Sequence, residues 1–216
     1  MHYQNLLFDL DGTLTDPGKG ITNSVAYALD KFGISVSDKS TLFPFIGPPL
    51  IESFMHYFSF TKQDAERAVV YYREYFSETG IFENTPYEGI HETLERLRAT
   101  GKRLFVATSK PELFAKRIIE HFDLAPYFDY VAGASFDEKR SEKWDVIRYA
   151  LGTCDLRDNS QIVMIGDRKH DILGAQKNNL DSVGVLWGYG DWNELSSAGA
   201  TNIVETQEEL ITLLTK

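Results

Sequence analysis

Short apolar runs alternate along this chain with longer segments in which apolar residues recur every three or four positions. The run Ile162–Ile165, IVMI, is apolar throughout, which is typical of a strand buried on both faces. Because strands and helices alternate, the pattern predicts an α/β fold in which a parallel sheet carries helices on both faces. We expect strands at Asn5–Leu10, Arg103–Ala107, Tyr130–Ala134, Gln161–Ile165 and Ser182–Trp187.

Helical spacing is clearest where a start or stop signal accompanies it. Ile90, Leu94 and Leu97 share one helical face, and Gly101 follows them as a stop signal. A second helix is expected after Pro111, because proline suits the first turn of a helix. These two helices flank the expected strand that begins at residue 103.

One stretch, Gly18–Thr79, has helical patterns and no convincing strand. Thr61 followed by Asp64 is typical of a helix start. The apolar positions after it keep helical spacing: Ala65, Ala68, Val69, Tyr72 and Phe76. We therefore expect a helical insert after the first strand.

The insert divides the chain into two expected domains. The core domain takes residues 1–15 and 82–216, and the cap domain takes residues 16–81. Ligands of an open parallel sheet bind at the carboxyl ends of its strands. An insert that leaves the sheet at that end would act as a lid over a bound ligand.

Composition narrows the classes of function. Hydrophobic residues make up 43% of the 216 residues, which suffices for a sizeable core. The formal net charge of −10 argues against binding to nucleic acid polymers or anionic membranes. Cys154 is the single cysteine, so a disulfide within the chain is excluded. With no apparent signal peptide or membrane span, we expect a soluble, cytoplasmic protein; its oligomeric state is not indicated.

The stretch FDLDGTLTDPGKG raises two chemical alternatives to a plain acidic turn. A phosphate-binding P-loop needs four residues between its glycines, whereas five separate Gly12 from Gly18, and Gly20 replaces the hydroxyl residue. An acidic pair fits better, because Asp9 and Asp11 are two residues apart in a strand and can face one point. Two such carboxylates repel unless a cation lies between them.

Two further strand ends carry polar side chains. Asp167 follows the IVMI strand, and Asp171 lies about one helical turn further on. Thr108 and Ser109 follow the strand that begins at Arg103, where a hydroxyl and a helix start suit an anion. Asp167 and Ser109 could each be an ordinary helix cap, but polar groups at three strand ends of one sheet favour a shared site.

A lysine completes this set of polar residues. Lys143 precedes a helical pattern that begins at Trp144. A solvated surface lysine is the usual alternative, and Lys139 and Arg140 are nearby cations that compete for the same role.

Taken in order, DLDGTLTD, the threonine of ATSKP, Lys143 and GDRKHD resemble the four motifs of the haloacid dehalogenase-like (HAD) hydrolase superfamily. The segments GITNSVAYALDKFGI and FIGPPLIESF resemble its branch with 5'-nucleotidase-like and phosphoglycolate phosphatase-like members and a helical cap. The resemblance implies a Rossmann-like core. The family's lysine is often followed by proline, whereas here it is followed by Trp144.

The resemblance also implies roles for these residues. Asp9 would be the nucleophile and Asp11 the general acid and base. Mg²⁺ would be held by Asp9, Asp167 and the backbone carbonyl of Asp11, with Asp171 outside the first ring of ligands. The groups expected to bind phosphate are Thr108, Ser109 and Lys143.

The expected function is that of a magnesium-dependent phosphomonoesterase acting on a small phosphorylated metabolite, with a nucleoside 5'-monophosphate or phosphoglycolate preferred. Two alternatives stay open: a phosphosugar mutase of the β-phosphoglucomutase kind, and a non-catalytic protein that binds a phosphorylated ligand. Candidates for choosing the leaving group are Thr22, Asn23 and the loop around Gly47, although ordinary helix surface and a proline turn explain them equally well.

Overall fold

The computed structural model describes residues 3–136 and 139–216, and the chain folds into two compact units. Unit 1 comprises Met1–Thr15 and Pro86–Lys216, and unit 2 comprises Asp16–Thr85. The chain passes between the units through two short strands that pair with each other, β2 (Thr15–Asp16) and β3 (Thr85–Pro86). The expected cap ended at residue 81, four residues before the end of unit 2.

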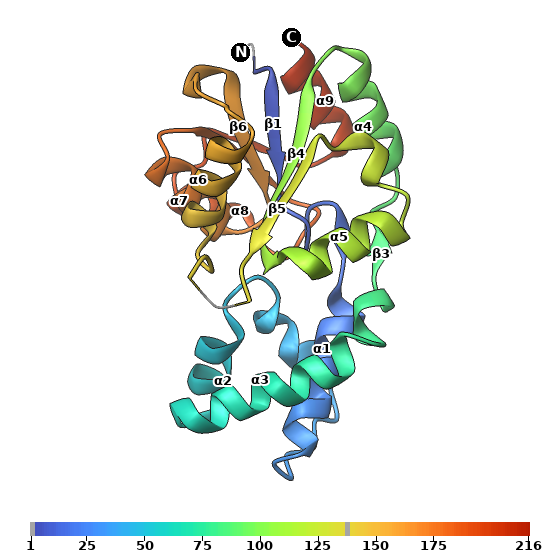
Figure 1. The fold of residues 1–216 in the computed structure, drawn as a ribbon, viewed down its shortest axis with the longest axis vertical. Coiled ribbons are helices and arrows are strands. Elements are labelled where there is room, and N and C mark those ends of the chain that lie inside the picture. Colours follow the sequence, from blue (N-terminus) through green and yellow to red (C-terminus); the bar gives the residue numbers. More distant parts are fainter. Residues whose placement is uncertain (1–2, 137–138) are drawn as a thin grey trace. The chain divides into compact units, whose positions relative to one another are not determined.

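Unit 1 is built on a six-stranded sheet in the order β5-β4-β1-β6-β7-β8, and every neighbouring pair is parallel (Figure 1). This confirms the predicted fold class. The strands are β1 (Asn5–Phe8), β4 (Arg103–Pro111), β5 (Tyr130–Ala134), β6 (Ile162–Gly166), β7 (Asp181–Val185) and β8 (Asn202–Val204).

The bounds of several predicted strands were wrong. Strand β1 ends at Phe8 rather than Leu10. Strand β4 does not end at Ala107 but continues to Pro111, so Thr108 and Ser109 belong to the strand. Its pairing with β5 shifts register between Thr108 and Pro111, and a simple apolar pattern does not predict that irregularity. Strand β7 ends at Val185 rather than Trp187, and the three-residue β8 was missed.

Helices cover both faces of the sheet, as expected for strands that are apolar throughout (Figure 1). One face carries α6 (Lys143–Thr153), α7 (Lys169–Lys177) and α8 (Trp192–Ser197). The other face carries α4 (Ile90–Ala99), α5 (Glu112–His121) and α9 (Gln207–Thr215). The core under α6 and α7 joins alternate strand residues to the helices, including Leu7, Phe105, Met164, Ile147 and Ala175.

Unit 2 contains α1 (Gly18–Asp30), α2 (Leu50–Phe58) and α3 (Lys62–Phe76), with 3₁₀ turns at Lys39–Phe45 and Gly80–Phe82. The predicted start of α3 is confirmed, because the Thr61 hydroxyl accepts a hydrogen bond from the Asp64 N–H at 3.1 Å. All five predicted apolar positions of α3 are buried. Aromatic contacts such as Phe45–Phe54 fill the interior of this unit.

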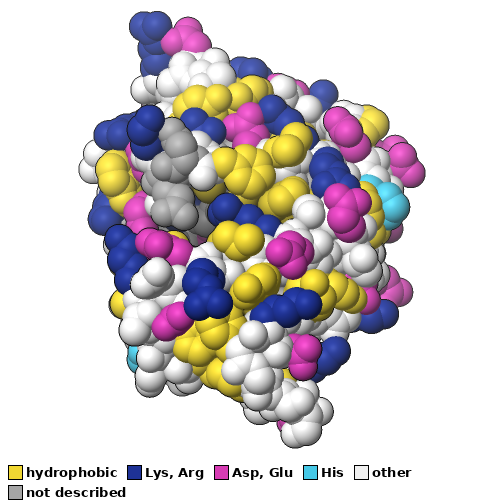
Figure 2. Space-filling model, turned by 60° about the horizontal axis from the view of Figure 1, so that its bottom comes forward, with side chains coloured by type: hydrophobic (Ala, Val, Ile, Leu, Met, Phe, Trp, Pro, Cys, Tyr) yellow, Lys and Arg dark blue, Asp and Glu magenta, His cyan; other side chains and the backbone are white. Residues whose placement is uncertain are grey.

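Charged side chains of both signs are interspersed over the face of the molecule drawn in Figure 2, with hydrophobic side chains between them. Among the described residues, the helices are too short or too polar to cross a bilayer.

Candidate active site

The strand ends that carry Asp9 and Asp167 lie side by side because β1 and β6 are neighbours in parallel register. Phe8 pairs with Ile165, so the residues that follow, Asp9 and Asp167, leave the same edge of the sheet. The Asp9 N–H donates to the Ile165 carbonyl at 2.9 Å. Asp9, Asp167 and Asp171 each offer a carboxylate oxygen, and these oxygens lie within 4.8 Å of one another. All three residues are buried.

Lys143 lies against this acidic cluster. Its Nζ is 2.7 Å from Asp9 Oδ1 and 2.7 Å from Asp171 Oδ1, and it donates to the Ala107 carbonyl at 3.1 Å. Burial alone would lower the pKa of Lys143, but the carboxylates of Asp171 and Asp9 outweigh it, so the pKa is raised. Lys143 is therefore a fixed cation that offsets part of the negative charge.

The competing cations lie elsewhere. The Arg140 Nε donates to the Gly133 carbonyl at 2.8 Å, and its guanidinium is 3.2 Å from the Glu112 carboxylate. Lys139 is exposed. Of the three candidates, Lys143 is the one with an ion pair to Asp9.

Asp171 belongs to the cluster itself. Its Oδ2 accepts the Arg168 N–H at 3.1 Å at the start of α7, which leaves Oδ1 for Lys143. Burial raises the pKa of Asp171 to about 6, with Lys143 opposing the rise and Asp9 adding to it. We expected this side chain outside the first ring of ligands. Its carboxylate oxygen lies within 4.8 Å of those of Asp9 and Asp167, and its place in the first or second ring stays a prediction.

Asp167 is fully buried. Its Oδ2 accepts the Tyr189 N–H at 2.8 Å, and the Thr13 hydroxyl is 3.4 Å from Oδ1. Burial raises the pKa of Asp167 well above its ordinary range, and the neighbouring Asp171 and Asp9 raise it further. This carboxylate is the one whose charge is least compensated by protein side chains.

Asp11 points to a different cation from that of Asp9. Its Oδ2 accepts a hydrogen bond from Lys110 Nζ, and both side chains are largely buried. Its Oδ1 is buried and has no hydrogen-bond partner among residues 3–136 and 139–216. Burial raises the pKa of Asp11, and Lys110 opposes this. Asp9 and Asp11 therefore differ in environment, as two carboxylates with different roles require.

The hydroxyl candidates on β4 differ in burial. Thr108 is buried, and its Oγ1 accepts the Lys110 N–H at 3.3 Å. Ser109 is half-buried. Thr108 stands next in the strand to Ala107, whose carbonyl binds Lys143.

One segment of the site escaped the sequence analysis, Trp187–Gly190, which follows β7. The Trp187 Nε1–H donates to the Thr13 carbonyl at 3.0 Å, and the Tyr189 N–H binds Asp167. The sequence shows a Gly-x-Gly pattern directly after an apolar strand, a signal of close backbone approach.

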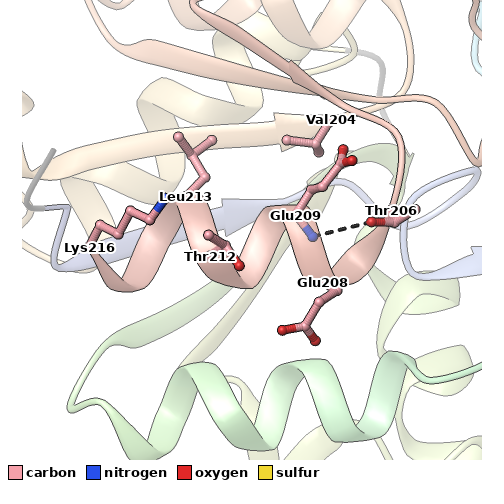
Figure 3. A pocket seen from close by; sticks show the side chains of 7 residues that line it. All are labelled: Val204, Thr206, Glu208, Glu209, Thr212, Leu213 and Lys216. Carbon is pink, nitrogen blue, oxygen red and sulfur yellow. Dashed lines mark hydrogen bonds between the residues drawn. The ribbon is translucent and has the colours of Figure 1, made fainter.

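An open hollow elsewhere on unit 1 is lined by residues of β8 and α9 (Figure 3). Its lining includes Glu208 and Glu209, whose charge would repel a phosphate. The side chains of the acidic cluster are not part of it. We assign no site to this hollow.

The acidic cluster suits a divalent cation. Its donors are carboxylate oxygens, which Mg²⁺ prefers. Two of the three carboxylates have raised pKa values because negative charge is crowded in a buried place, and a cation would relieve that crowding. The residues present therefore fit Mg²⁺.

Comparison with known proteins identifies the family of this chain. The family model described as haloacid dehalogenase-like hydrolase matches residues 6–185, and the chain belongs to this family. A 5'-nucleotidase from Pseudomonas aeruginosa is 45% identical over 202 residues, covering 94% of this chain and 91% of that protein. Tyrosine-protein kinase PtkA from Mycobacterium tuberculosis is 40% identical, covering 96% of this chain and 71% of that protein.

The fold has a close match among solved structures. The crystal structure of a predicted phosphatase from Clostridium acetobutylicum superposes with a TM-score of 0.95 at 50% identity and covers 99% of both chains. These relatives support a phosphatase, and they confirm the predicted family.

Proposed function

We propose that this chain is a Mg²⁺-dependent phosphomonoesterase that hydrolyses a small phosphorylated metabolite through a phosphorylated Asp9. The observation that carries the proposal is that the carboxylate oxygens of Asp9, Asp167 and Asp171 lie within 4.8 Å of one another at one edge of the sheet, with Lys143 Nζ 2.7 Å from both Asp9 and Asp171. An acidic site alone would repel a phosphate dianion, since two like charges 4 Å apart cost about 4 kcal/mol at an effective dielectric of 20. Bound Mg²⁺ would supply the positive charge that admits the ester.

In the first proposed step, an Asp9 carboxylate oxygen attacks phosphorus and the bond from phosphorus to the leaving oxygen breaks. Asp11 gives a proton to that leaving oxygen. Its raised pKa favours the protonated form that this step needs, and its unpartnered Oδ1 is the atom we assign to the transfer.

In the second proposed step, water attacks phosphorus and passes a proton to Asp11, while the bond from phosphorus to the Asp9 oxygen breaks. Inorganic phosphate leaves, and Asp9 is restored as a carboxylate. Lys143 holds the Asp9 carboxylate in place through their ion pair. We also assign to Lys143, Thr108 and Ser109 the binding of the phosphoryl oxygens, where charge spreads in the transition state.

The preferred substrate class is a nucleoside 5'-monophosphate, because the 45%-identical relative is a 5'-nucleotidase. Phosphoglycolate is the second choice. We assign unit 2 the role of a cap that selects the leaving group. Within unit 2, the Thr22 hydroxyl donates a hydrogen bond to the Gly18 carbonyl at 2.7 Å. The Asn23 side-chain NH₂ donates to the Glu83 carboxylate at 2.7 Å, and the Asn23 side-chain oxygen accepts from Lys39 Nζ at 2.5 Å. Both side chains are thus hydrogen-bonded within unit 2, and both stay candidates for selectivity.

The deciding experiment is a phosphate-release screen over nucleoside monophosphates, phosphoglycolate and sugar phosphates, with Mg²⁺ or with EDTA. Asp9→Asn is the control variant, and we expect it to lose essentially all turnover while its circular dichroism stays that of the wild type. Full turnover in Asp9→Asn would remove Asp9 as nucleophile. Isomerised sugar without phosphate release would favour the mutase, and binding without turnover would favour a phospho-ligand binder.

The relative named as a tyrosine-protein kinase gives a second candidate, transfer of a phosphoryl group from ATP to a tyrosine hydroxyl. It ranks below the phosphatase, because that relative is less similar and this chain covers less of it. Adding ATP and a tyrosine-containing peptide to the same screen separates the two. Phosphotyrosine in the peptide would support the kinase, and phosphate released from monoesters supports the phosphatase.

A further inference from the structure

The segment Trp187–Gly190 lies beside Asp167 for a reason that the sheet provides. Strands β6 and β7 are parallel neighbours, and Gly166 pairs with Gly184 near their ends. The residues that follow the two strands therefore leave the sheet side by side. This segment meets both the loop after β1 and the residue after β6, so it joins two of the motifs that carry the chemistry.

Two hydrogen bonds make the connection. The Trp187 indole N–H donates to the Thr13 carbonyl at 3.0 Å, and the Tyr189 backbone N–H donates to Asp167 Oδ2 at 2.8 Å. The first bond fixes the segment to the loop that carries Asp9 and Asp11. The second fixes one oxygen of Asp167, so the carboxylate cannot rotate freely and the other oxygen keeps its direction.

The two glycines of the segment allow this close approach. A Cβ on Gly188 would stand 2.4 Å from Asp167 Oδ2 and 2.3 Å from the Gly12 carbonyl oxygen. A Cβ on Gly190 would stand 1.9 Å from the Asp167 carbonyl oxygen. All three distances are too short for a side-chain atom, so the glycine backbone forms part of the wall around Asp167, which is fully buried.

We propose that Trp187 is a positioning residue: its indole N–H anchors the 187–190 segment so that the Tyr189 amide presents Asp167 to a divalent cation. This inference rests on the proposed function for the identity of the ion, and it adds a residue that acts without touching substrate. Partners of this kind, one step removed from a metal, change metal affinity by about 10–100-fold when they are lost.

The test measures metal binding directly, with Mn²⁺ as the probe and the free Mn²⁺ signal read by electron paramagnetic resonance. Trp187→Phe keeps an aromatic ring and removes the N–H. Trp187→His keeps a ring N–H two bonds from Cγ, as in tryptophan. Trp192→Phe is the matched control, because Trp192 lies five residues on and is 54% exposed. Urea unfolding of each variant in EDTA gives its stability without the ion.

We expect Trp187→Phe to weaken Mn²⁺ binding about tenfold, Trp187→His to recover part of that loss, and Trp192→Phe to bind like the wild type. A residue that only packs would give the reverse order for the first two, since phenylalanine fills apolar space better than histidine. Mn²⁺ affinity in Trp187→Phe equal to that in Trp192→Phe would overturn the proposal, as would wild-type protein that binds no Mn²⁺.

A phosphate-release assay distinguishes failure of the proposed phosphatase function from failure of the positioning role of Trp187. In Trp187→Phe, we expect the Mg²⁺ concentration for half-maximal rate to rise about tenfold, while the ester's KM at saturating Mg²⁺ stays unchanged. If the wild type binds Mn²⁺ and Trp187→Phe weakens it, but no ester is hydrolysed, the proposed function fails and the positioning role stands. If esters are hydrolysed and Mn²⁺ affinity does not change, the function stands and this inference fails.

Discussion

Two buried lysines pair with acids at the strand ends, but they do so in different ways. Lys143 is shared between Asp9 and Asp171, and its Nζ is 2.7 Å from each. Lys110 pairs with Asp11. The Lys143 side of the site thus brings two carboxylates to one lysine, with Asp167 close by, whereas on the Lys110 side the pair that the structure shows is Lys110 with Asp11.

The difference shows how one small site keeps two kinds of carboxylate. On the Lys143 side, negative charge remains in excess, which is the condition for holding a cation. On the Lys110 side, burial raises the pKa of Asp11 while Lys110 opposes the rise, which suits the proton transfer that we propose for Asp11. Each of the following changes should affect one side more than the other.

Lys143→Met should have the largest effect. Removing the shared cation leaves Asp9 and Asp171 buried without their lysine, and breaking a buried ion pair from one side costs about 3–5 kcal/mol. Turnover should fall about 10²–10³-fold, because a donor near the transferred phosphoryl group is lost. Urea denaturation in EDTA and a phosphate-release assay with Mg²⁺ measure the two effects.

Wild-type stability in Lys143→Met would show that the lysine does not compensate the acidic cluster. The matched control is Lys110→Met, which removes a lysine of similar burial from the other side.

The second-largest expected effect is on stability when Mg²⁺ is removed, and it should differ between variants of the two sides. A ligand at 100 times its dissociation constant stabilises the folded state by about 2.7 kcal/mol, so Mg²⁺ should raise the urea midpoint of the wild type relative to EDTA. In Lys143→Met, Mg²⁺ should raise the urea midpoint by more than in the wild type, since the ion then compensates negative charge of the acidic cluster that Lys143 no longer offsets. In Lys110→Met the increase should equal that of the wild type. If the urea midpoint is the same with Mg²⁺ as with EDTA in all three proteins, the result would contradict a cation site at Asp9, Asp167 and Asp171.

Lys110→Met itself should cost less than Lys143→Met. The Asp11 carboxylate would be left without its base, and a buried polar group that loses its partner costs about 1–3 kcal/mol. Burial already raises the pKa of Asp11, so protonation can relieve part of this cost. Urea midpoints at neutral pH compare the two variants. A larger loss in Lys110→Met than in Lys143→Met would reverse the comparison.

The sequence predicted the Lys143 side better than the Lys110 side. Asp9 and Asp167 each follow an apolar run that is long enough to be recognised as a buried strand, so their meeting at one sheet edge follows from parallel order. Lys143 was assigned through the family resemblance, because nothing local to residue 143 distinguishes it from a surface lysine. The ion pair of Lys110 with Asp11 was not predicted.

The elements that escaped prediction depend on contacts between distant strands. The β8 strand has only three residues, too few for an apolar pattern to stand out. The continuation of β4 through Thr108 depends on its irregular pairing with β5. The role of Trp187 depends on the register of β6 against β7, which no local signal in the sequence reports.

The smallest change in stability is expected for a variant away from the site, at an acidic residue that is exposed rather than buried. Asp129 binds Arg98 at 2.5 Å and Arg103 at 2.8 Å, and both arginines are substantially exposed. Burial works to raise the pKa of Asp129, but the hydrogen bonds from Arg103 and Arg98 outweigh it, so the pKa is lowered. Since solvent screens such pairs, Asp129→Asn should cost about 0.2–1 kcal/mol at neutral pH.

The pH dependence of the stability loss in Asp129→Asn shows whether the loss comes from the Asp129 carboxylate. A carboxyl group with a lowered folded pKa contributes stability that is present above its unfolded pKa, about 3.9, and is lost as pH falls through the folded pKa. The difference in urea midpoint between wild type and Asp129→Asn should therefore stay constant from pH 7 to pH 5 and shrink only below about pH 4. It should also shrink in high salt, whereas the larger difference for Lys143→Met should persist because that cluster is buried. If the Asp129→Asn difference already shrank between pH 7 and pH 5, another titrating group would be responsible.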